Sequence, residues 1–168
     1  MRAPVWLAAA LLVAALPVAA RADAALDAAQ AKWRAAKLVS YEYGYHKFCE
    51  CHRDSPPETV VSVRDGKVVN VRHRPVGSTT EVPAAEKNFE YYWTVDGLFA
   101  LVAAAQKRQA EVRAQYDPTI GYPTAIYIDY DKDLIGDELD LRLTGVTPLP
   151  SAVRHHLESG IDRPKTPP

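Results

Sequence analysis

The sequence has no excess of positive charge. Its 20 lysines and arginines are balanced by 21 aspartates and glutamates, which gives a formal net charge of −1. Nucleic-acid binding needs a basic surface that neutralises phosphates. The composition therefore excludes a nucleic acid as the main partner.

The sequence also lacks the common catalytic motifs. It contains no H-E-x-x-H metalloprotease motif, no glycine-rich phosphate loop and no nucleophile elbow around any serine. Catalytic residues can be dispersed along a chain, so an enzymatic activity is left open. No catalytic residue and no cofactor is predicted.

Cysteine is scarce, with only Cys49 and Cys51, and His46 and His52 lie close by. In an extended chain, Cα atoms two residues apart lie about 6.6 Å apart, near the upper limit of about 6.8 Å for a disulfide. A disulfide would bend the chain and be easily reduced. A soft-metal site formed with a histidine is the second reading, and a redox-active dithiol is the third. The disulfide is the preferred interpretation.

The one long apolar run, from Val5 to Ala15, is shorter than the roughly 20 residues that span a bilayer. Arg2 precedes the run, Pro17 ends it, and Ala20-Arg21-Ala22 resembles a cleavage site. We therefore expect residues 1–22 to be a signal peptide, which sends the protein to the periplasm or outside the cell. No transmembrane segment is expected after cleavage.

The mature chain would have 146 residues and, without Arg2 and Arg21, a formal net charge of −3. That length suffices for a hydrophobic core without disulfides or metals. We expect one domain at residues 23–147. A proline-rich tail with a short polar helix is expected at 148–168.

Hydrophobic periodicity predicts the elements of this domain. Apolar steps of three and four residues predict helices over 23–37, with Leu26, Ala29 and Trp33 on one face, and from Thr94 to about Arg108. Thr94 is the expected N-cap. Alternation with period two predicts strands over 39–51, 59–64, 67–74, 112–116, 124–130 and 139–143.

The hairpin around Asp65-Gly66 is predicted from its register. A two-residue loop would pair Val61 with Asn70 and mix the two faces. A three-residue loop, with Gly66 left-handed, pairs Val61 with Val69. We therefore predict the longer loop, with Val61, Val63, Val69 and Val71 all on the buried face.

The predicted fold is α+β, in the order α-β-β-β-α-β-β-β. Two helices pack on one face of a twisted, mainly antiparallel sheet of five to six strands. The core is expected to combine Trp33, Leu98, Phe99 and Val102 with alternate residues of the strands: Val61, Val63, Val69, Val71, Ile126, Ile128, Leu139, Leu141 and Leu143.

The stretch Asp129-x-Asp131-x-Asp133 resembles the start of a calcium loop, with Asp140 at its twelfth position. Leu134 stands where that loop needs glycine, and Asp140 replaces the bidentate glutamate. We prefer the interpretation that these acids cap turns between strands.

Several short motifs occur together in a fixed order: Tyr41-x-Tyr43, Cys49-x-Cys51, Val61-x-Val63-x-x-Gly66, Thr94-Val95-Asp96-Gly97-Leu98-Phe99, Tyr116-Asp117, Gly121-Tyr122-Pro123, Asp129 and Asp137-Glu138. In this set the chain resembles a bacterial family of exported or lipid-anchored domains of unknown function, over about residues 29–143. Many members resemble lipoproteins, but this chain has no cysteine at the cleavage site. The resemblance assigns no activity.

The sequence favours two alternative functions. The first is a non-catalytic module that binds an unknown protein partner in the cell envelope. It would use the open sheet face or the loops at 75–90 and 117–123. The surface candidates are Tyr91, Tyr92, Tyr122, Pro123, Asp129, Asp137 and Glu138. The second is a small metal- or thiol-handling protein that uses Cys49, Cys51, His46 and His52.

Overall fold

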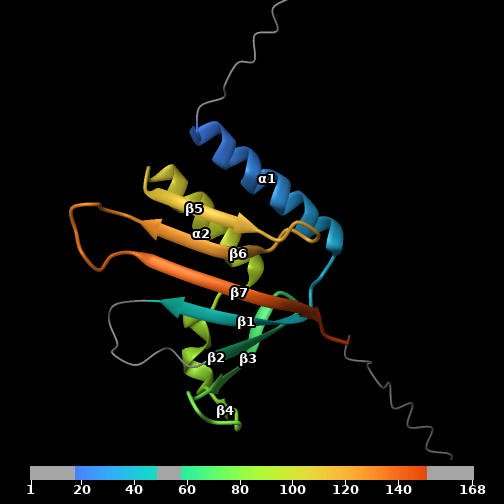
Figure 1. The fold of residues 1–168 in the computed structure, drawn as a ribbon. Coiled ribbons are helices and arrows are strands. Elements are labelled where there is room, and N and C mark those ends of the chain that lie inside the picture. Colours follow the sequence, from blue (N-terminus) through green and yellow to red (C-terminus); the bar gives the residue numbers. More distant parts are fainter. Residues whose placement is uncertain (1–17, 49–57, 151–168) are drawn as a thin grey trace, which may run out of the picture.

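The computed structural model describes residues 18–48 and 58–150, which fold into one antiparallel sheet with helices on one face (Figure 1). The strand order is β4-β3-β2-β1-β7-β6-β5. The helices are α1 (Val18–Ala36), η1 (Glu86–Tyr91, a 3-10 helix) and α2 (Val95–Lys107). The strands are β1 (Tyr41–Phe48), β2 (Glu58–Arg64), β3 (Lys67–Arg74), β4 (Val82–Pro83), β5 (Glu111–Tyr116), β6 (Pro123–Asp129) and β7 (Leu139–Pro148).

The predicted α+β class with a mainly antiparallel sheet is confirmed, but the predicted order is incomplete. The described residues form seven strands, and β4 and η1 were not predicted. Two meanders, β1-β2-β3 and β5-β6-β7, join side by side through β1 and β7. This junction pairs residues about a hundred positions apart, for example Gly44 with Thr144.

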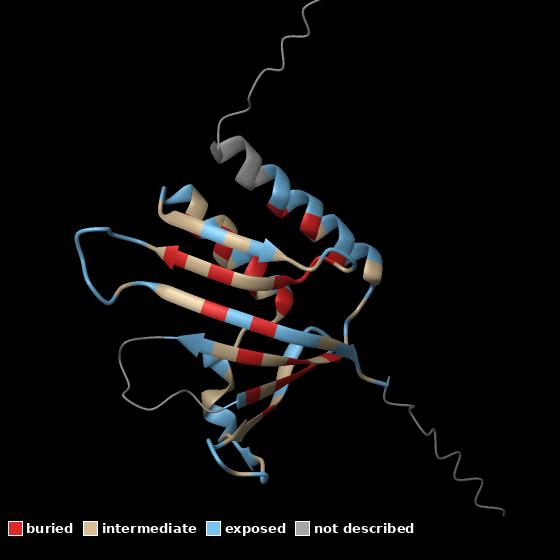
Figure 2. Ribbon diagram, in the orientation of Figure 1, coloured by how far each residue is buried: buried red, intermediate tan, exposed pale blue. Residues whose placement is uncertain are grey.

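Alternate residues of the strands are buried and form the core (Figure 2). Leu141 and Leu143 are 0% and 2% exposed, and Ile126 and Ile128 are both fully buried. Three tyrosines of β1 also point inward: Tyr41, Tyr43 and Tyr45. The strand predicted to begin at Val39 begins instead at Tyr41, and Val39 is 61% exposed.

The β2–β3 hairpin corrects the predicted three-residue loop. Arg64 pairs with Lys67 around a two-residue loop. Asp65 and Gly66 both have positive φ, 48° and 73°, as a type I′ turn requires. A bulge at Val69 then restores the inward parity of β3.

This bulge has a direct effect on the core. Because one residue of β3 is left over, Val61 pairs with Val71, and both are fully buried. Val69 is 43% exposed instead of buried. Loop length alone does not fix the register of this hairpin, because a bulge further along the strand shifts it by one residue.

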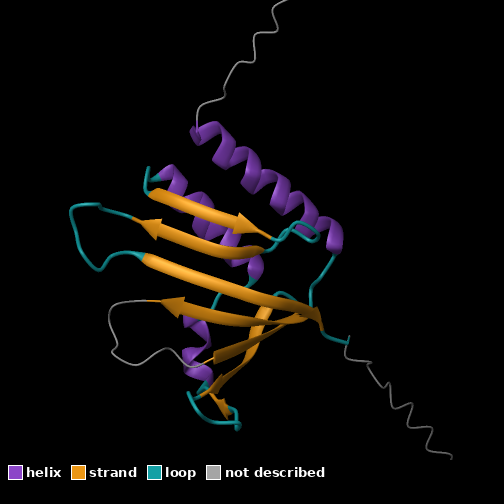
Figure 3. Cartoon of the chain, viewed as in Figure 1, coloured by secondary structure: helices purple, strands orange, loops and turns teal. Residues whose placement is uncertain are grey.

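Helix α2 matches its prediction and covers β5 and β6 (Figure 3). The Thr94 hydroxyl oxygen accepts a hydrogen bond from the Gly97 amide at 3.1 Å, which makes Thr94 the N-cap. The buried face of the helix consists of Val95, Leu98, Phe99, Val102 and Ala105.

Helix α1 packs against α2 and against the turn between β5 and β6 more than onto the sheet. Among its residues 24–36, those that are buried are Leu26, Ala29 and Trp33, and the Trp33 ring meets Tyr41 of β1 edge-on at 5.1 Å. No helix in the described part of the chain combines the length and the apolar character needed to cross a membrane.

Candidate functional site

One face of the sheet carries none of the described helices, and the half of it formed by the end of β1 and by β7, β6 and β5 combines arginines with aromatic rings. On this face Phe48 of β1 lies opposite Asp140 of β7, Asp140 opposite Tyr127 of β6, and Tyr127 opposite Arg113 of β5. The next row places His46 opposite Arg142. We call these six residues the Arg–aromatic patch.

The two arginines of the patch form cation–π contacts with its aromatic rings. The Arg113 guanidinium lies 4.1 Å from the centroid of the Tyr127 ring, and that of Arg142 lies 5.9 Å from Phe48. Arg142 also forms an ion pair with Asp140. Phe48 is 45% exposed and lies 5.2 Å from the His46 ring. Exposed arginine and aromatic side chains are the residues most enriched in protein interfaces.

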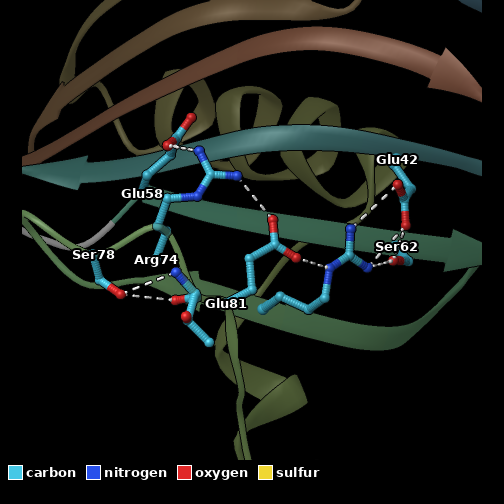
Figure 4. A network of polar contacts seen from close by, with 8 residues as sticks. Glu42, Glu58, Ser62, Arg74, Ser78 and Glu81 are labelled. Atoms are coloured by element: carbon cyan, nitrogen blue, oxygen red, sulfur yellow. Dashed lines mark hydrogen bonds and ion pairs between the residues drawn. The ribbon is translucent and has the colours of Figure 1, made fainter.

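The other half of the same face is occupied by ion pairs among its own residues (Figure 4). Arg72 contacts Glu42 at 3.1 Å and Glu81 at 2.7 Å. Arg74 contacts Glu58 at 2.7 Å and Glu81 at 3.0 Å. This Arg–Glu network ties β1, β2 and the segment before β4 to β3, so we interpret it as structural.

The network makes stability depend on pH. Hydrogen bonding to Arg72 lowers the pKa of Glu42 and of Glu81 below the usual glutamate value of 4.5. A lowered carboxyl pKa stabilises the folded state above the unfolded-state pKa, and this contribution is lost as the pH falls through the folded-state pKa.

We therefore expect Arg72→Gln to lower the free energy of unfolding by about 1 kcal/mol at pH 7, since these groups are partly exposed. The cost should shrink steadily as the pH falls below about 4.5. Urea unfolding at several pH values measures it, with Lys67→Gln on the same strand as the control. A cost that is as large at pH 3 as at pH 7 would contradict the network.

The tyrosines of β1 hold the start of α2 against the opposite, buried face of the sheet. The Tyr41 hydroxyl accepts a hydrogen bond from the Val95 amide at 2.9 Å, and the Tyr43 hydroxyl donates to the Trp93 carbonyl. Burial raises the pKa of Tyr41 to about 12. These two tyrosines have a structural role, since their hydroxyl groups form hydrogen bonds with backbone atoms just before α2 and at its first residue.

Tyr92 lies next to His73 and Thr59, which form a chain of polar contacts with it on the helix-covered face of the sheet. His73 lies between Thr59 Oγ1, 3.0 Å from its Nδ1, and the Tyr92 hydroxyl, 3.4 Å from its Nε2. Burial lowers the pKa of His73, which favours the neutral imidazole. The Tyr92 ring packs edge-on against Tyr45 at 5.4 Å. The Tyr92 side chain is therefore in contact with Tyr45 and His73 of the domain itself.

The remaining aromatic candidates divide by exposure. Tyr91 is 64% exposed and is accessible to a partner. Tyr122 is 9% exposed and Pro123 is fully buried, because the turn that carries them lies beneath α1. The structure therefore assigns Tyr122 and Pro123 to the core and not to a contact surface.

The acidic candidates lie on and beside the β6–β7 loop, residues 130–138. Asp129 is opposite Glu111 at the end of β6, and Glu138 accepts a hydrogen bond from the Gly136 amide at 2.9 Å. Asp129 Oδ1 and Asp137 Oδ1 are buried and have no hydrogen-bond partner among the described residues. Burial, followed by the charges of Asp137, Glu138 and Glu111, raises the pKa of Asp129.

The same loop bears on the calcium reading. Asp131 Oδ1 accepts a hydrogen bond from the Asp133 amide at 3.1 Å, so this acid caps a turn as the preferred interpretation predicts. Within residues 18–48 and 58–150, no three histidine, cysteine or acidic side chains are placed to hold a metal ion.

The region that carries this geometry coincides with a family of sequences, whose model matches residues 25–148. The chain belongs to DUF6174, a family of unknown function. No curated protein and no solved structure matches the chain. The predicted resemblance to a family of unknown function is thereby confirmed.

The DUF6174 region contains both meanders, helix α2, residues 25–36 of helix α1 and the Arg–aromatic patch. Cys49, Cys51 and His52 lie outside the described residues, so the disulfide and the metal or thiol readings stay predictions. His46, their nearest described neighbour among the candidates, lies in the patch beside Phe48.

The patch itself was missed at the residue level. The sequence patterns predicted an open sheet face. They did not single out Phe48, Arg113, Tyr127 or Arg142 as part of a site. The available signal was the outward parity of each strand, where arginine and aromatic residues alternate with the buried leucines and isoleucines.

Proposed function

We propose that this domain is an exported, non-catalytic module that binds a partner protein in the cell envelope through the Arg–aromatic patch. The supporting observation is the contrast between the two halves of one sheet face. The β1–β3 half is occupied by its own ion pairs. The other half, formed by β5–β7 and Phe48 of β1, has ion pairs of Arg113 with Glu111 and of Arg142 with Asp140, but these two arginine side chains are 67% and 45% exposed. Their guanidinium groups lie over the rings of Tyr127 and Phe48.

The proposal of export rests on the leader and is compatible with the packing of α1. The helix begins at Val18, before the expected cleavage site after Ala22. Within residues 24–36, where the structure describes burial, the buried residues of α1 are Leu26, Ala29 and Trp33, and these three follow that site. Removal of residues 1–22 would therefore retain Leu26, Ala29 and Trp33.

Site-specific photo-crosslinking in an envelope extract of the source organism tests the proposal. A photoreactive amino acid replaces Gln115, which is exposed and lies beside the patch. The matched position is Asn70, on β3 in the other half of the same face. We expect a discrete adduct from position 115 and none from position 70.

Patch variants then show whether the adduct depends on the proposed residues. Adding Tyr127→Ala or Arg113→Glu should reduce the yield of the adduct about tenfold. Circular dichroism confirms that these variants fold. Equal adducts from positions 70 and 115, or an adduct that neither variant weakens, would refute the proposal.

A further inference from the structure

We infer that the partner presents apolar side chains surrounded by lysine or arginine, and that the β6–β7 loop binds them. This inference rests on the proposed function and specifies the chemistry of the partner. It depends on three features of the loop at 130–138: an exposed apolar tip, an uncompensated negative charge and a shape fixed before binding.

The tip of the loop exposes large apolar side chains. Ile135 is 88% exposed, Leu134 is 58% exposed, and Tyr130 at the base of the loop is 40% exposed. Single exposed apolar residues are common on protein surfaces, but neighbouring ones on a projecting loop indicate an interaction site. Figure 1 shows this loop extending beyond the end of the sheet.

The loop is acidic around that tip. Residues 129–138 contain four aspartates, one glutamate and a single lysine, for a formal net charge of −4. The lysine, Lys132, is engaged with Glu111 at 2.9 Å. The buried Oδ1 atoms of Asp129 and Asp137 have no hydrogen-bond partner among the described residues.

Buried carboxylate oxygens without donors are costly in a free protein. A cationic side chain from a partner would offset the mutual repulsion of these acids. An acidic turn alone would be a solvated connection. Its combination with an apolar tip favours a partner with complementary basic and apolar groups.

The loop is already ordered in the free protein. Asp131 caps the turn through its side chain and accepts the Leu134 amide at 2.9 Å through its carbonyl. Glu138 accepts the Gly136 amide, and the Lys132–Glu111 ion pair ties the loop to β5. Such preorganisation lowers the entropy lost on binding.

The loop is continuous with the Arg–aromatic patch. Asp129 and Glu111 occupy the open-face position next to Tyr127 and Arg113 on β6 and β5. A partner that covers the patch therefore reaches the acidic loop without crossing a helix.

A double variant, Asp129→Asn with Asp137→Asn, separates a binding role from a structural one. If these acids serve binding, removing their repulsion should raise the melting temperature of the free protein. The rise should be larger at pH 7 than at pH 3, because the pKa of Asp129 is raised and its carboxyl group therefore destabilises the fold only above its unfolded-state pKa. A lower melting temperature at pH 7 would assign the acids a structural role and refute the inference.

Binding is measured by NMR titration of the isotope-labelled protein, purified after export, with short peptides as probes. One peptide alternates lysine and leucine, a second replaces the lysines by glutamate, and a third replaces the leucines by serine. We expect the lysine–leucine peptide to shift the amide signals of residues 129–138. The glutamate peptide should not bind, and the serine peptide should bind about tenfold more weakly.

The variants complete the test. The Asp129→Asn/Asp137→Asn protein and Ile135→Ser should each weaken the lysine–leucine peptide about tenfold, whereas Glu58→Gln in the Arg–Glu network should not. Equal binding of the lysine and glutamate peptides would refute the inference. The photo-crosslink at position 115 is a separate measurement. An adduct there that survives the double variant would leave the proposed function standing while the inference fails.

Discussion

Replacing Leu141 by aspartate is expected to abolish folding. Leu141 is fully buried at the centre of the sheet, opposite Ile126 on β6 and Lys47 on β1. Removing a buried leucine side chain alone costs about 2–5 kcal/mol. Burying an unpaired carboxylate adds several kcal/mol, and a typical domain is stable by only about 5–15 kcal/mol.

The matched control is Thr144→Asp, which places the same charge on the exposed face of the same strand. Circular dichroism and thermal unfolding of both variants measure the outcome. The control should retain a cooperative transition, and Leu141→Asp should show none. A folded, soluble Leu141→Asp protein would show that the assigned parity of β7 is wrong.

Gly121→Ala should also destabilise the protein strongly. Gly121 has a φ of +85° in the turn between β5 and β6, and a Cβ atom there would lie 2.3 Å from the Ala29 carbonyl oxygen. It would also lie 2.9 Å from Lys32 Cβ. Left-handed backbone costs a non-glycine residue about 1–3 kcal/mol, and overpacking costs about 1–3 kcal/mol more.

Gly136→Ala separates these two contributions. Gly136 has a φ of +96° on the exposed β6–β7 loop, and a Cβ atom there would meet nothing within 4 Å beyond its chain neighbours. It should therefore bear the backbone cost alone. Chemical denaturation of both variants gives the difference, which measures how closely α1 is seated on the turn. Equal losses would mean that the contact between Gly121 and α1 does not exist in solution.

The elements that sequence patterns predicted well are those whose signal is local. The alternation Leu139, Leu141, Leu143 and the helical spacing in α2 each fit within about a dozen residues, and the N-cap Thr94 lies directly before its helix. Both patterns arise because one face of the element is buried. The sequence alone is therefore sufficient to predict these elements.

The features that sequence patterns missed depend on contacts distant in the chain. Strand β4 has only two residues and pairs with β3 through Arg72 and His73. The bulge at Val69 appears only when two strands are placed in register. Neither has a periodic signal of its own, because neighbouring strands determine both.

The residues of the candidate site could not be predicted from the sequence for the same reason. Each strand shows which of its residues face outward, but not which strands adjoin. Phe48 and Asp140 are brought together by the pairing of β1 with β7, across more than ninety residues of chain. Once that junction is known, the outward residues of four strands form one patch. The acids at 129, 137 and 138 were noticed in sequence, but their position beside this patch was not.

Hydrogen–deuterium exchange tests the central claim most directly, with the protein measured alone and in complex with the partner captured at position 115. We predict slower exchange on binding in β5, in β6 and in the loop at 130–138, with β2 and β3 unchanged. Protection confined to β2 and β3, or to the outer surface of α1 and α2, would contradict the assignment of the binding surface.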